Sequence, residues 1–117
     1  MTDVPFRVEP SPTPGEAPLG YEPPIDGRVR LTVRLGDRPT GGYRIAVTSV
    51  TRSGPRLDVH CESDAPEAGA IVTQVLTSPA QTVSIAEELV RGVQDAVLLD
   101  GSGTELAHIS HISRISA

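Results

Sequence analysis

Few side chains in this chain have the type and spacing that catalysis or metal binding requires. His60 and Cys61 would be a base and a nucleophile, but neighbouring residues of a strand point to opposite faces, so they form no dyad unless a bulge intervenes. His108 and His111 would share a metal ion on a helix, but their segment suits a strand end better than a helix. The sequence therefore predicts a protein that is not an enzyme and that holds no metal and no cofactor.

Composition and charge exclude further classes of function. All ten basic residues are Arg, which rules out a Schiff-base lysine and a phosphate-loop lysine. A net charge of −5 and 3% aromatic residues are a poor match to the phosphates and bases of a nucleic acid. Cys61 is the one cysteine, so neither an intramolecular disulfide nor a cysteine-based zinc site can form.

Targeting and membrane signals are missing from the sequence as written. No apolar run approaches the ~20 residues of a membrane-spanning helix, and no secretory leader is visible. These observations predict a cytoplasmic chain with no membrane contact, and they leave its actual location open.

The first 27 residues differ from the rest of the chain. They contain seven of the eleven prolines, and five carboxylates against Arg7 give them a net charge of −4 out of the total of −5. Proline lacks the amide donor that sheets need, so residues 1–27 are expected to form an extended, polyproline-like arm. The arm is either a disordered tail or a strap that docks on a partner or on the domain itself.

From residue 28 the pattern becomes that of strands. Apolar residues alternate with polar ones, which is typical of extended backbone with one buried face. Ser53-Gly54-Pro55 is a turn that should join two neighbouring strands as a hairpin. The strands that the pattern predicts are 28–35, 42–52, 57–62, 71–77, 82–85, 96–99 and 105–109.

Two further local signals complete the expected fold. Ser84-Ile85-Ala86-Glu87 has the spacing of a capping box and predicts one or two helical turns over 87–91. Asp100-Gly101-Ser102-Gly103 predicts the hairpin turn between the last two strands. About seven short strands predict a single all-β domain over 28–117, either a small antiparallel β-sandwich or a partly open barrel.

One face of the first strand carries Arg28, Arg30 and Arg34. Two interpretations are open for this face. The arginines are a binding patch, or their charge keeps an exposed face or edge from aggregating.

Two loops stand out as candidate binding segments. In 36–43, two consecutive glycines before Tyr43 allow backbone angles that are closed to other residues, so the loop turns Tyr43 into the core, projects as a recognition loop, or does both. In 66–79 a loop feeds a strand that ends in another sharp turn. The candidate binding residues are Pro39, Thr40, Gly41, Gly42, Tyr43, Thr73, Gln74, Thr77 and Pro79.

These two loops resemble the C-terminal domain of the PrcB family, which is named as a protease complex subunit. The resemblance rests on Gly36, on Pro39-Thr40-Gly41-Gly42-Tyr43, on Pro66 and Gly69, on Val72-Thr73-Gln74-Val75-Leu76-Thr77-Ser78-Pro79, and on Val83 and Ile85 in a closing strand. It covers residues 28–86 and leaves 87–117 as a C-terminal extension. The resemblance implies a non-catalytic accessory domain that binds a protein partner, with a protease as the candidate.

Two other functions stay open. Residues 39–43 are also similar to the Pro-Thr-Thr-Gly-aromatic loop of chagasin-like cysteine-protease inhibitors, although the Gly-x-Gly-Gly and Arg-Pro-aromatic loops of those inhibitors do not occur here. A structural β domain, joined to a larger assembly by its proline-rich arm, is the third possibility. The sequence leaves the oligomeric state open.

Overall fold

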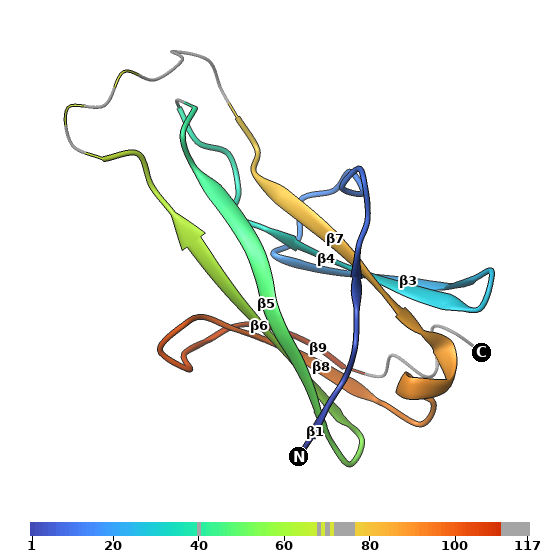
Figure 1. The fold of residues 1–117 in the computed structure, drawn as a ribbon. Coiled ribbons are helices and arrows are strands. Elements are labelled where there is room, and N and C mark those ends of the chain that lie inside the picture. Colours follow the sequence, from blue (N-terminus) through green and yellow to red (C-terminus); the bar gives the residue numbers. More distant parts are fainter. Residues whose placement is uncertain (40, 68, 70, 72–76, 111–117) are drawn as a thin grey trace.

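The computed structural model is a sandwich of two β-sheets (Figure 1), and it describes residues 1–39, 41–67, 69, 71 and 77–110. One sheet has the strand order β1-β5-β6-β8-β9 and the other β2-β7-β4-β3. The predicted all-β sandwich is therefore confirmed. The strands are β1 (Thr2–Asp3), β2 (Arg7–Val8), β3 (Leu19–Ile25), β4 (Arg28–Arg34), β5 (Arg44–Ser53), β6 (Arg56–Asp64), β7 (Ala80–Ala86), β8 (Asp95–Leu99) and β9 (Glu105–Ile109).

The core lies between the two sheets and is built from aliphatic side chains that alternate along the strands. In β4 the side chains of Val29, Leu31 and Val33 are buried, whereas the residues between them face the other way. Side chains from β5, β6, β7 and β8 join the same cluster. Burial of each such side chain stabilises the fold by about 1.5–3 kcal/mol, which lets a chain with few aromatic residues form a packed interior.

Both predicted hairpins are present, but the alternation along β5 is interrupted. β5 pairs antiparallel with β6, and β8 pairs antiparallel with β9. In β5, Val47 stands opposite Cys61 and Ser49 opposite His60, so Thr48 is the extra residue of a β-bulge. Beyond the bulge the buried position shifts by one residue, and Val50 rather than Ser49 enters the core.

The connection from β7 to β8 contains the predicted helical turn, but without the predicted cap. Residues Glu87–Val90 form one 3-10 turn, η1, without a side-chain cap. The expected capping box is wrong because Ser84 is fully buried in β7, where its hydroxyl accepts a hydrogen bond from Arg28 Nε at 2.9 Å. The connection carries the chain to the other sheet, where β8 pairs with β6 in parallel, a pairing that the antiparallel prediction did not include. No helix in the described ranges is long and apolar enough to cross a membrane.

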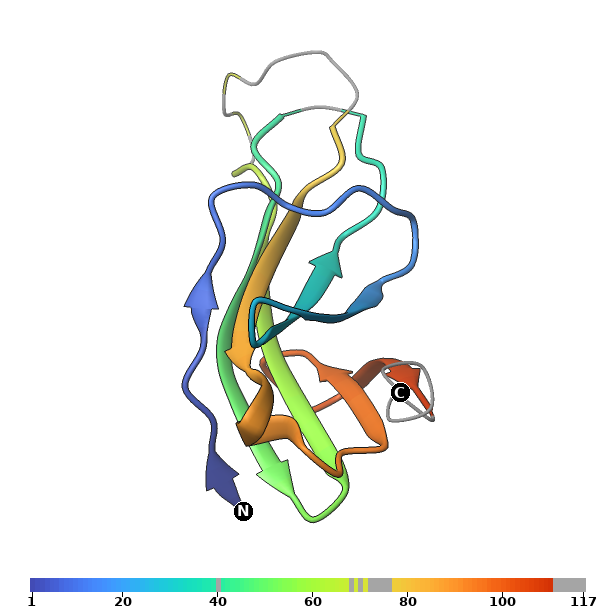
Figure 2. The ribbon, with the colours of Figure 1, turned by 90° about the vertical axis from the view of Figure 1, so that its right-hand side faces the viewer.

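The first 27 residues are built into the sandwich, so the boundary predicted at residue 27 does not separate an arm from a domain. The chain starts on one sheet, where β1 pairs with β5, and moves to the other, where β2 pairs with β7 (Figure 2). Strand β3 then pairs with β4 along most of its length. The segment is extended, as expected, and its prolines Pro23 and Pro24 are tolerated because β3 is an edge strand with a register irregularity at that point.

The outer face of β4 and β7 is polar and nevertheless buried. Thr32, Thr82 and Ser84 expose 2%, 1% and 0% of their surface. The Thr32 and Thr82 hydroxyls lie 2.7 Å apart, and the Thr82 hydroxyl also accepts a hydrogen bond from the Thr13 amide at 2.8 Å. The proline-rich segment therefore covers this face and supplies the partners that buried polar groups need.

The arginines of β4 fasten this face, so neither interpretation of the arginine face describes the structure. Arg30 Nε lies 3.2 Å from Glu9 Oε1. Arg34 donates to the carbonyl of Ala17 at 2.9 Å and to that of Thr13 at 3.0 Å. The guanidinium groups of Arg30 and Arg34 are thus hydrogen-bonded to residues 9–17, and we call this segment the strap.

Glycine lets the backbone approach Arg34 closely. A Cβ atom placed on Gly20 would lie 2.8 Å from Arg34 Nη1 and would push the guanidinium out of its position. Gly20 is therefore required by the arginine that holds the strap, and not by its own backbone angles.

We predict that Arg34→Ala releases the strap. The free energy of unfolding should fall by about 1–2 kcal/mol because carbonyl partners of a charged donor are lost, and hydrogen exchange should accelerate at the amides of Glu9 and Thr13. Gly20→Ala should have the same effect by displacing the guanidinium.

Arg44→Ala is the matched control for these variants. Its ion pair with Asp64 is largely exposed, so its loss should change stability by less than ~0.5 kcal/mol. Unchanged exchange at Glu9 and Thr13 in both strap variants would show that Arg34 does not hold the strap.

Candidate functional site

The residues considered first for chemistry lie in separate environments. Cys61 belongs to the buried core, whereas the His60 ring is partly exposed and lies 3.4 Å from the Thr51 hydroxyl. His108 lies 3.6 Å from Asp95 at the surface, and His111 falls outside the described residues. Within the described residues no three His, Cys, Asp or Glu side chains are placed to hold a metal ion.

The two loops singled out by sequence meet at one end of the sandwich (Figure 1). The amide of Arg38 donates to the carbonyl of Thr77 at 2.7 Å, and the amide of Thr77 donates back at 2.8 Å. The Ser78 hydroxyl donates to the Asp37 carboxylate, which adds a side-chain link. Residues 37–39, 41–43 and 77–79 thus form one continuous surface, which we call the loop surface.

Tyr43 lies at the edge of the loop surface and not in the core. It is partly buried, and the Arg38 guanidinium carbon lies 5.5 Å from the centre of its ring, within the range of a cation–π contact. Gly42, just before it, has a φ of 90°, which an L side chain adopts only with strain. The double-glycine corner therefore turns the chain and leaves the ring beside Arg38 at the surface.

The predicted binding residues are only in part on the described surface. Pro39 and Gly42 are exposed, whereas Gly41, Tyr43, Thr77 and Pro79 are partly buried. Thr40, Thr73 and Gln74 lie outside the described residues, as does most of the predicted strand 71–77.

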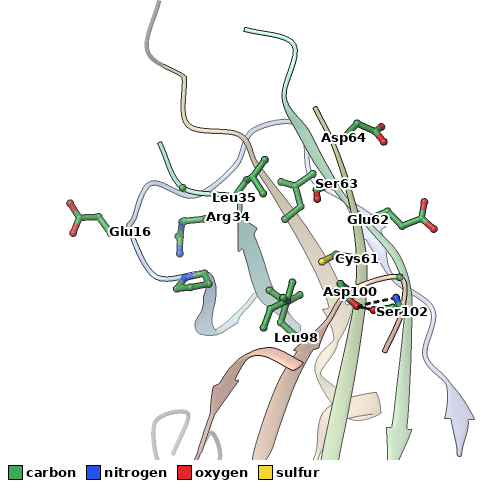
Figure 3. A pocket seen from close by; sticks show the side chains of 15 residues that line it. Glu16, Arg34, Leu35, Cys61, Glu62, Ser63, Asp64, Leu98, Asp100 and Ser102 are labelled. Atoms are coloured by element: carbon green, nitrogen blue, oxygen red, sulfur yellow. Dashed lines mark hydrogen bonds between the residues drawn. The ribbon is translucent and has the colours of Figure 1, made fainter. Parts of the chain in front are cut away.

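A groove opens beside the loop surface, between the end of β4 and the strands β6 and β8 (Figure 3). Its volume is about 610 Å³, within the range of about 300–1,000 Å³ that binding sites occupy. Leu35, Cys61 and Leu98 point into it from three different elements (Figure 3). Burial raises the pKa of the Cys61 thiol, so this group is neutral near pH 7 and adds to an apolar floor.

Carboxylates stand around the opening of the groove. Glu16 comes from the strap, Glu62 and Asp64 from β6, and Asp100 from the turn between β8 and β9. Hydrogen bonds from the Ser102 hydroxyl and the Thr104 amide lower the pKa of Asp100, so this carboxylate keeps its charge into the acidic range. The side chains of Glu16, Glu62 and Asp64 point away from the cavity (Figure 3), so these residues surround the groove without turning their carboxylates towards its floor.

Sequence reasoning missed the groove because four separate segments build it. Leu106, which lines it and is 49% exposed, is the extra residue where the register of β8 and β9 shifts. A period-two alternation of apolar and polar residues cannot predict the position of the extra residue in a β-bulge. An exposed leucine next to a glycine-rich turn was the one available signal.

Asp100 gives a test of the electrostatics at this rim. Its folded-state pKa is lowered, so its contribution to stability is present at neutral pH and is lost as the pH falls below about 4, the ordinary value. Asp100→Asn should therefore melt below the wild type at pH 6, and the difference should shrink towards pH 3. A difference that is constant over this range would contradict the shift.

Comparison with known proteins gives one match. Residues 31–86 match the family model described as PrcB C-terminal. No curated protein and no solved structure matches the chain. The matched range runs from β4 to the end of β7 and contains the loop surface together with Arg34, Leu35, Cys61 and Glu62 of the groove. The segment 31–86 of this chain belongs to the PrcB C-terminal family.

Proposed function

We propose that this chain is a non-catalytic accessory domain that binds another protein, as a subunit of a protease complex, through its loop surface. The family match supports the association with a protease, since the resemblance is to a protease complex subunit. The binding mode is argued from the geometry of the loop surface.

One observation carries the proposal: the two signature loops are joined by a reciprocal pair of backbone hydrogen bonds between Arg38 and Thr77. Leu35 adds a third bond, since its amide donates to the Pro79 carbonyl at 2.9 Å. A surface that is held in this way is pre-organised, so a partner binds it without a large ordering cost.

Tyr43 and Arg38 are the residue types that dominate binding energy in protein interfaces. Tyr43 offers a ring whose exposed part is already oriented by Arg38, and Arg38 is itself held by a hydrogen bond of 3.1 Å to the Leu35 carbonyl. A partner gains contact area here at little cost in side-chain entropy. The domain thus supplies a rigid anchor rather than reactive groups.

The test is capture of a partner from the native host with the full chain as bait. Wild type should retain a protease or a protease-associated protein, and Tyr43→Ala should weaken that capture by tenfold or more, about 2 kcal/mol. Because Tyr43 is outside the core cluster, the variant should melt close to the wild type.

Two outcomes would contradict the proposal. One is a Tyr43→Ala domain that loses several kcal/mol of stability, which is the cost of removing a core residue. The other is an unchanged set of captured proteins with Tyr43→Ala. Inhibition of a papain-like protease by the isolated chain would instead favour the chagasin-like alternative, and a stable homo-oligomer without another partner would favour the structural one.

A further inference from the structure

We infer that the strap is a displaceable internal ligand, and that the face of β4 and β7 beneath it binds an extended acidic segment of the partner in its place. This inference rests on the proposed protein-binding function and adds to it a second recognition element and the chemistry of the segment that is recognised. It concerns residues 9–17 and the arginines of β4, which lie outside the two signature loops.

The strap covers this face without adding an apolar side chain to the core. It joins the two outer strands of its sheet, β2 and β3, and crosses β7 and β4 between them (Figure 2). Within the strap, Glu9 and Thr13 are partly buried and the other residues are exposed. The chain is anchored in the core on either side of the strap, by Val4 and by Leu19. The strap can therefore open while the sandwich stays folded, as loosely held segments of proteins do.

The hydrogen bonds that hold the strap are of kinds that another extended segment can supply. The carbonyls of residues 13, 14 and 17 accept from Arg34, and the Thr13 amide donates to the Thr82 hydroxyl. The Glu9 carboxylate adds an ion pair with Arg30. The face thus binds an extended backbone together with a carboxylate, and a segment of the partner with these groups can replace the strap.

The covered face has donors and charge to spare. Arg30 Nη1 and Arg34 Nε are buried and have no hydrogen-bond partner in the part of the chain that the structure describes. A segment that brings a further acceptor to these donors removes the cost of leaving them unpaired. Once the strap has left, the guanidinium groups of Arg28, Arg30 and Arg34 stand against the carboxylate of Glu22, which lies opposite Arg30 in β3. The positive charge selects an acidic segment.

The position of the strap connects it to the loop surface. Residues 12–16 of the strap line a cavity of about 540 Å³ together with Asp37, Ser78 and Pro79 of the loop surface. A partner that covers the loop surface therefore lies beside the strap. Proline at positions 10, 12 and 14 holds the strap extended, and proline-rich segments of this kind are ligands that bind with a small loss of conformational entropy.

The probe is a capped peptide with the sequence of residues 9–18, titrated at low salt into the full ¹⁵N-labelled chain. The chain carries Glu9→Gln with Thr13→Pro, which loosens its own strap by removing a carboxylate and an amide donor and leaves the face unchanged. We expect saturable shifts at the amides of Arg30, Thr32 and Ser84, with a dissociation constant at or below about 1 mM. In the wild type the intact strap competes at a high effective concentration, so the peptide should bind about tenfold more weakly.

Three controls locate the site. Arg34→Ala also opens the strap but lacks the guanidinium that holds it, so the peptide should bind this variant at least tenfold more weakly than the double variant. The peptide with Gln in place of both Glu should lose as much affinity for the double variant. Glu88→Gln removes an exposed carboxylate from η1 and should bind the peptide as the wild type does.

Hydrogen exchange in the wild type tests the opening of the strap without any variant. The amides of Glu9 and Thr13 donate to Thr82, and they should exchange at least tenfold faster than the amide of Leu31 in the core, because the strap opens without global unfolding. Equal exchange at the three amides would show that the strap is an inseparable part of the sandwich and would overturn the inference.

Three further results would overturn it: no saturable shift at about 10 mM peptide, equal binding by the Arg34→Ala and double variants, or a wild-type dimer on gel filtration, which would assign the face to a second copy. Partner capture separates this inference from the proposed function. If the peptide does not bind and Tyr43→Ala still loses the partner, the strap inference fails and the proposed function stands. If the peptide binds under the strap but the wild type captures no protein, the proposed function fails and the binding face stands.

Discussion

The fixed position of the Arg34 guanidinium is the constraint on which the rest of the structure depends. One side chain at the end of β4 holds the strap through the carbonyls of Thr13, Pro14 and Ala17, and the loop surface begins three residues later at Asp37. A guanidinium is suited to this task because its donors lie in one rigid plane and match several carbonyl groups at once. The glycine at position 20 leaves the space that this arrangement needs.

The fixed position of Arg34 also determines which residues line the groove. The strap brings Glu16 to one side of the opening only because Arg34 fixes the residues around it, while β6 brings Glu62 to the other side. Cys61 and Leu98, which lie at its floor, belong to the buried core. The position of the strap beside the groove and the stability of the fold thus both depend on Arg34.

The sequence predicted the sandwich well because most strands alternate with period two, and the two signature loops led directly to the loop surface. The sequence-based predictions were less accurate where a side chain forms its hydrogen bonds with a segment that is distant in the sequence. Ser84 has the spacing of a helix cap, but its hydroxyl binds Arg28 across the sheet. The proline-rich segment was open to interpretation as a disordered tail or as a strap, and the sequence did not show that Thr82 and Arg34 hold it on the domain. The bulges at Thr48 and Leu106 shift the alternation of buried and exposed residues by one position. A strictly periodic pattern cannot predict such a shift.

The central claim is that a partner protein sits at the end of the sandwich where the two signature loops meet. Replacing Tyr43 with a photoreactive phenylalanine in the native host tests this claim most directly, with the same replacement at Glu88 as the reference position. The account predicts a covalent adduct with a protease or a protease-associated protein from position 43 and none from position 88. Adducts from position 88 alone, or the same adducts from both positions, would contradict it.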